Sequence, residues 1–155
     1  MACGQPAAFV LAFAVILVSE TAGTCPDCGL TLGRLAWPTH AYIGGSPSCW
    51  AMFGEVLARE YSDAVYMKVH QLTVDTYAVQ HPGRPEPRAI RSVWGHLASL
   101  YWQVGKDAPA DIGRRAIPVV AAIGDELGWL TPPSKPAGMT IRDVFLAADA
   151  AEHRK

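Results

Sequence analysis

The stretch CPDCGLTLGRLAWPTHAYIGGSPSCW, residues 25–50, decides the fold of this chain. Most of it is rich in glycine and proline and has no sustained periodicity, so it is expected to form loops and turns. Such a segment has little apolar core of its own and needs another source of order. It also carries Cys25, Cys28, His40 and Cys49, and side chains of these types can order a loop by binding a metal ion.

The cysteine spacing is typical of a structural zinc site. Cys25 and Cys28 form a C-x2-C pair, in which a tight turn lets both thiolates point at one ion. Cys49 is expected in the first turn of a helix, where the helix dipole favours a thiolate. We expect His40 to be the fourth ligand, with His70 as the alternative. Four protein ligands leave no coordination position for water or substrate, so the predicted role of the zinc is structural.

Two other interpretations of the cysteines stay open. Cys25 and Cys28 could form a redox pair, and all the thiols could be inert, with Cys49 acting as a small buried apolar residue. A thioredoxin-like site needs a strand before the motif and a helix starting at it, within an α/β fold. The sequence shows neither feature.

Helical periodicity dominates the rest of the chain. Ser46 and Pro47 predict the start of a helix that continues over residues 50–60. Further helices are expected over residues 62–80 and 86–104, because their apolar residues recur at helical spacing.

Two more helical pieces are expected toward the C-terminus. Pro118 predicts the first turn of one, because a proline inside a helix would break it. Thr140 and Asp143 predict a capping box at the start of one last continuous helix. No segment shows the alternation of a strand. The expected fold class is therefore all-α, a small bundle of four to five helices preceded by a loop-rich zinc-knuckle-like module over residues 24–50.

Composition limits the possible partners. A chain of 155 residues that is 50% hydrophobic fits one domain, expected here as a single helical domain over residues 24–155. Its net charge of −1 gives no field that would attract nucleic acid, so no nucleic-acid partner is expected. The sequence does not specify a protein partner, and it leaves a homodimer open.

The N-terminus, residues 1–23, is expected to be an apolar extension. Its apolar run, residues 7–18, is too short to span a bilayer, which needs about 20 residues. The run has the length of a signal-peptide core, but no Lys or Arg precedes it. We therefore favour a start site assigned too far upstream and a cytoplasmic protein. Export is the alternative if the segment is a true signal.

The remaining histidines suggest a second hypothesis. His70, His96 and His153 lie on three expected helices and could surround a catalytic metal ion, which would make the protein a metal-dependent hydrolase or transferase. The local H-x3-H or E-x2-H pair of such sites is missing. His81 is expected to cap its helix. The favoured function is therefore binding or scaffolding around a structural zinc ion.

The motifs CPDCG, PTHAYIG, SPSCWAMFGEVLAREYSD, HQLTVDTYAVQHPG, SVWGHL and WLTPP resemble the family known as domain of unknown function 5946, over residues 25–153. The resemblance implies a cytoplasmic helical protein of bacteria without an established activity. The family pattern begins near CPDCG, so residues 1–23 depart from it. In the family that the chain resembles, the last helix continues beyond the position of Lys155.

Overall fold

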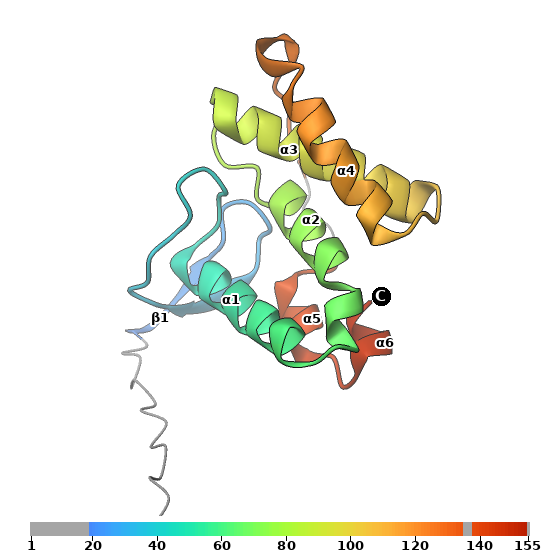
Figure 1. The fold of residues 1–155 in the computed structure, drawn as a ribbon. Coiled ribbons are helices and arrows are strands. Elements are labelled where there is room, and N and C mark those ends of the chain that lie inside the picture. The colour runs from blue at the N-terminus through green and yellow to red at the C-terminus, as the bar shows by residue number, and fades with distance from the viewer. Residues whose placement is uncertain (1–18, 135–137, 155) are drawn as a thin grey trace, which may run out of the picture.

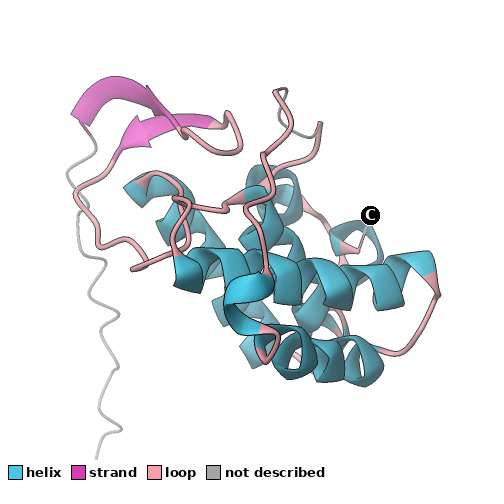
Figure 2. Ribbon diagram, turned by 90° about the horizontal axis from the view of Figure 1, so that it is seen from above, coloured by secondary structure: helices cyan, strands magenta, loops and turns pink. Residues whose placement is uncertain are grey.

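The structure is a computed structural model that describes residues 19–134 and 138–154. A two-stranded hairpin lies over a set of helices (Figures 1 and 2). The apolar run over residues 7–18 lies outside the described residues. The elements are, in order, β1 Ser19–Thr24, β2 Thr31–Arg34, α1 Pro47–Ser62, the 3-10 helix η1 Tyr66–Lys68, α2 His70–Gln80, α3 Pro87–Leu100, the π-helix η2 Tyr101–Gly105, α4 Ala110–Ala121, the 3-10 helix η3 Gly124–Glu126, α5 Ile141–Leu146 and α6 Ala150–His153.

The hairpin corrects the expectation of an all-α fold. β1 and β2 are antiparallel, with Gly23 opposite Leu32 and Thr24 opposite Thr31. The strands have six and four residues and are rich in small and polar side chains, so they lack the alternation that reveals a half-buried strand. β1 also begins at Ser19, inside the segment expected to be an extension. The predominantly helical character of the chain is as expected.

The start of α1 confirms the predicted cap. The Ser46 side chain accepts a hydrogen bond from the Cys49 backbone N–H at 3.2 Å, and Pro47 occupies the first helical position. The buried residues of α1 follow at intervals of three and four, so they form one stripe. This stripe consists of Cys49, Phe53, Val56 and Glu60.

The next helices differ from the prediction at their ends. Only a 3-10 turn, η1, precedes α2 where a continuous helix was expected, and α3 passes into the π-helix η2.

The expectation for Pro118 was wrong, because Pro118 lies inside α4. The reason is packing: α4 lies along α3 (Figure 1), and a Cβ on Gly113 would lie 2.8 Å from Ser99 Oγ. The contact between the two helices outweighs the local cost of the proline.

The end of the chain forms two short helices instead of one. The capping box of Thr140 and Asp143 is present as predicted, and the Thr140 N–H donates to Asp143 Oδ2 at 2.7 Å. α5 then ends at Leu146, and the Arg59 guanidinium donates to Phe145 O at 2.6 Å and to Ala147 O at 3.4 Å, so it satisfies carbonyl groups at this end. The side chain of Asp149 caps α6 by accepting from the N–H groups of its first turn.

The hydrophobic core surrounds the cysteines. Three cysteines belong to the main buried cluster, and the helices α1, α2 and α5 close around them. The other members of the cluster are Leu30, Phe53, Val56, Tyr77 and Ile141.

No helix within residues 19–134 and 138–154 is long and apolar enough to cross a membrane.

The capping box of α5 gives a first prediction. Asp143→Ala should lower the free energy of unfolding by about 0.5–1 kcal/mol, because it removes an acceptor and a negative charge from a helix N-terminus. The bond from Thr140 holds the pKa of Asp143 below its usual value, so its stabilisation is present above the unfolded pKa of about 4 and is lost as the pH falls through the lower folded value. Urea unfolding at pH 7 and at pH 3 measures both effects. Glu55→Ala, on the exposed face of α1, should change stability by under about 0.5 kcal/mol.

Candidate metal centre

Four side chains from three parts of the chain meet in one buried group. Cys25 and Cys28 come from the hairpin, Cys49 from the first turn of α1, and His81 from the residue that follows α2. One ligand atom from each lies within 4.8 Å of the other three. All four residues are at most 5% exposed. We refer to these four residues as the Cys3His group.

The local sequence of the hairpin turn builds the first half of the group. The Cys25 N–H donates to Leu30 O at 2.8 Å, and the Gly29 N–H donates to Cys25 O at 3.0 Å. Gly29 has a φ of 75°, a conformation that glycine adopts without strain. This turn directs both thiols toward the start of α1.

The spacing of the ligand atoms fits a tetrahedral ion. Zinc bonds of about 2.3 Å to sulfur and about 2.0 Å to nitrogen place two sulfurs about 3.8 Å apart and a sulfur and a nitrogen about 3.5 Å apart. The Cys28 and Cys49 sulfurs lie 3.8 Å apart, and Cys49 Sγ lies 3.4 Å from His81 Nε2. Both distances match those of ligands around one ion.

The His81 ring is oriented for ligation. Its Nδ1 lies 2.8 Å from Tyr77 O, and because a carbonyl only accepts, Nδ1 carries the proton. Nε2 therefore faces the sulfurs as the free ligand atom, an orientation common among metal-bound histidines. The ring also stacks on Tyr77, with centroids 3.9 Å apart. The predicted capping role of His81 thus coexists with a place in the Cys3His group, because each uses a different ring nitrogen.

A glycine-rich loop, residues 42–45, packs against the Cys3His group. The Gly44 N–H donates to His81 O at 3.0 Å, and Gly45 donates to the side chain of Asp27. A Cβ on Gly44 would lie 2.0 Å from Asp27 Oδ2 and 3.1 Å from Gly83 Cα. Only glycine allows this approach of the loop to both the hairpin and the end of α2.

The electrostatics of the group favour negative charge on Cys25 and disfavour it on Cys49. Hydrogen bonds from Cys28 and Cys49 hold the pKa of Cys25 well below its usual range. Burial opposes a charge on His81, but hydrogen bonds to the sulfurs of Cys25 and Cys28 outweigh it and raise its pKa to about 9. The bonds to Cys25 and Cys28, together with burial, raise the pKa of Cys49. A buried thiolate of this kind is stabilised by a neighbouring cation.

A model of a family of unknown function, DUF5946, matches residues 23–155. The chain belongs to the DUF5946 family. No curated protein and no solved structure matches it.

In this DUF5946 chain the sequence-predicted ligands divide into two sets. Cys25, Cys28 and Cys49 come together, as expected of a shared ion. His40 and His70 do not join them, and His81 stands in the place expected for His40. His40 Nδ1 instead accepts hydrogen bonds from the N–H groups of residues 42 and 43, so His40 organises the glycine-rich loop. The sequence signal that was missed is the His-Pro-Gly turn over residues 81–83. The chain leaves α2 at this turn, and His81 lies beside the glycine-rich loop.

His70 and His153 flank one buried carboxylate. Glu60 is fully buried, and its Oε2 accepts from His70 Nδ1 at 2.7 Å. Its Oε1 accepts from His153 Nε2 at 2.7 Å and from the Thr73 hydroxyl at 2.5 Å. These contacts join α1, α2 and α6 through one carboxylate.

His96 pairs with a different carboxylate. Asp75 is fully buried and accepts from His96 Nδ1 at 2.7 Å and from Ser99 Oγ at 2.5 Å. The side-chain amides of Gln71 and Gln103 donate to it at 2.8 and 2.7 Å. His70, His96 and His153 therefore do not share one site, and within the described residues they form no group that could hold a metal ion. This arrangement corrects the hypothesis of a three-histidine metal site.

The fit around Gly44 predicts a sharp difference between two glycines. Gly44→Ala should destabilise the protein by about 1–3 kcal/mol, because the new Cβ would collide with Asp27 and with the backbone at Gly83. Thermal unfolding of the variant and of the wild type measures the loss. Gly54→Ala is the matched control: it lies in α1, where the new Cβ would meet no atom within 4 Å apart from its chain neighbours and the nearby backbone of α1, and it should stabilise by about 0.5–1 kcal/mol. Equal effects of the two substitutions would contradict this account of the loop.

The Asp75 network predicts a second loss of stability. Asp75→Asn replaces one of the two acceptor oxygens by an NH2 group, which cannot accept from the donors there, and it should cost about 1–3 kcal/mol in urea unfolding. Asp125→Asn, at a carboxyl that is 92% exposed, should cost under about 0.5 kcal/mol. A change of under about 0.5 kcal/mol for Asp75→Asn would mean that the network does not hold α2 to α3.

Proposed function

We propose that Cys25, Cys28, Cys49 and His81 bind one zinc ion that folds the N-terminal part of this protein. The observation that carries the proposal is the spacing of their ligand atoms, all within 4.8 Å of one another and all buried. Three sulfurs and one imidazole nitrogen form a common structural zinc set. Soft thiolate ligands favour zinc over magnesium or calcium.

The proposed role of the ion is structural. Four protein ligands complete a tetrahedron and leave no position for a substrate or an attacking water. The burial of all four residues supports the same role, because a substrate would have no path to the ion. The hairpin and the glycine-rich loop have few apolar side chains of their own, so the free energy of metal binding would be free energy of folding.

The cysteines are better suited to a metal than to disulfide exchange. All three are free and buried. A thiolate that attacks a disulfide needs access to its partner, and Cys25 and Cys28 are 1% and 5% exposed. The proposed site requires reduced thiols, which fits a reducing compartment such as the cytoplasm.

A binding or scaffolding protein is the function that this centre supports best. Zinc would fix the hairpin, the loop over residues 42–45 and α1 relative to α2, so that the ion determines the shape of this end of the molecule. The ion itself would take no part in a reaction. A partner would contact the surfaces that the ion positions.

Metal analysis of the purified full chain tests the ligand set. The wild type should contain one zinc per chain, and Cys25→Ser and His81→Asn should each lower the zinc content and the melting temperature. His40→Asn is the matched control, because His40 lies outside the Cys3His group, and it should keep its zinc. Elemental analysis and thermal unfolding measure these quantities.

The opposite pattern would overturn the proposal. Full zinc content in His81→Asn together with loss in His40→Asn would restore His40 as the fourth ligand. A wild-type protein that neither contains zinc nor becomes more stable when zinc is added would exclude a structural zinc centre. Cobalt substitution adds a spectroscopic check, since a tetrahedral thiolate site gives a strong sulfur-to-cobalt absorption.

A further inference from the structure

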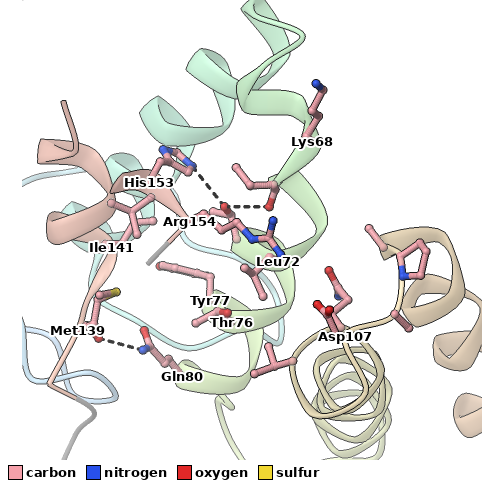
Figure 3. Close-up of a pocket in the computed structure, with 18 of the residues that line it drawn as sticks. Lys68, Leu72, Thr76, Tyr77, Gln80, Asp107, Met139, Ile141, His153 and Arg154 are labelled. Carbon is pink, nitrogen blue, oxygen red and sulfur yellow. Dashed lines mark hydrogen bonds between the residues drawn. The ribbon is translucent and has the colours of Figure 1, made fainter. Parts of the chain in front are cut away.

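A cavity of about 700 Å³ lies between α2, the loop from η2 to α4, and the C-terminal helices (Figure 3). Its size is within the range of small-molecule sites, about 300–1,000 Å³. Tyr77 lines the cavity, and its hydroxyl donates to Cys49 Sγ at 3.7 Å, so the cavity lies next to the Cys3His group but does not include it.

Apolar side chains from three elements form much of the cavity wall. They are Val69, which directly precedes α2, Leu72 on α2, Val104 on η2, and Ile141 and Val144 on α5. The π-helix η2 contributes to this wall, and π-helical turns are frequent at functional sites. The wall therefore suits the apolar body of a ligand.

Two cations line the same cavity. Lys68 and Arg154 are both exposed, and neither forms an ion pair within the part of the chain that the structure describes. Figure 3 shows Arg154 reaching toward α2 near Leu72, with Asp107 on the facing loop. Asp107 is the one carboxylate among the lining residues, so the charge of the lining is positive. Cations without partners favour a ligand that carries negative charge.

Polar side chains complete the cavity wall. His153 lines the cavity, and its Nε2 is fixed by Glu60. Thr76, Gln80 and Gln103 add hydrogen-bonding groups to the lining.

We propose that this cavity binds a small organic anion, with an apolar body against α2 and α5 and an acidic group held by Lys68 and Arg154. The proposal goes beyond a structural zinc ion and does not depend on it. It is based on the cavity, on its apolar wall, and on two lining cations that form no ion pair with the described residues.

Titration calorimetry with decanoate tests the proposal on the full chain. Decanoate should bind saturably with one site per chain, and decanol, its uncharged analogue, should bind at least tenfold more weakly. The double variant Lys68→Gln/Arg154→Gln should weaken decanoate binding at least tenfold. Arg114→Gln is the matched control, since Arg114 is an exposed cation on α4 outside the cavity, and it should leave the affinity unchanged.

A second variant tests the place of binding. Thr76→Trp would fill the cavity from α2 and should abolish decanoate binding. Zinc content and melting temperature are measured on every variant, which separates loss of the cavity from loss of the fold. Non-saturable binding, equal binding of decanol, or an unchanged affinity in the double variant would overturn the proposal. If Thr76→Trp does not fold, the double variant, which alters only exposed side chains, decides the outcome.

Discussion

The convergence of three sulfurs and one imidazole nitrogen in a dry interior is the central constraint on this fold. These atoms come from residues separated by as many as 56 positions in the sequence, from Cys25 to His81, yet they lie within 4.8 Å of one another. Thiolates are costly to bury without a cation, so a divalent ion bound by this group would stabilise it. The apolar core is arranged around this group, because Phe53 and Tyr77 stack beside it at a centroid distance of 3.9 Å.

The helix α2 connects this centre with the rest of the molecule. One end holds Tyr77 and leads to His81, while the middle presents Thr73 to Glu60 and Asp75 to the donors of α3 and η2. Both carboxylates are fully buried and are satisfied by neutral or histidine donors instead of Lys or Arg. Such networks favour one arrangement of the helices, because any other packing would leave the carboxylates without partners. These polar contacts act together with the apolar contacts that Tyr77 and Val74 of α2 make with the core.

The sequence predicted the features that depend on local chemistry. The Ser46 and Pro47 start of α1 and the capping box at Thr140 are set by neighbouring residues, and both were expected. The C-x2-C pair and Cys49 also drew attention correctly to one region of the chain. The features that were missed involve contacts between distant segments: α4, which contains Pro118, packs on α3, and Arg59 of α1 binds carbonyl groups at the end of α5. His81 was missed for the same reason, since spacing within residues 25–50 made His40 the nearer candidate, and only the return of the chain after α2 brings His81 to the sulfurs.

The position of His81 in the sequence sets an order of assembly during synthesis on the ribosome. Cys49 precedes His81 by 32 residues, so an ion that meets the emerging chain can find at most three ligands of the Cys3His group until α2 has been made. For an ion to bind the complete group, the three thiols would have to stay reduced through that interval. The contact between Glu60 and His153 spans 93 residues, so α1 and α6 can be joined only after α6 has been made. The Cys3His group can therefore assemble before the contacts of Glu60 are complete.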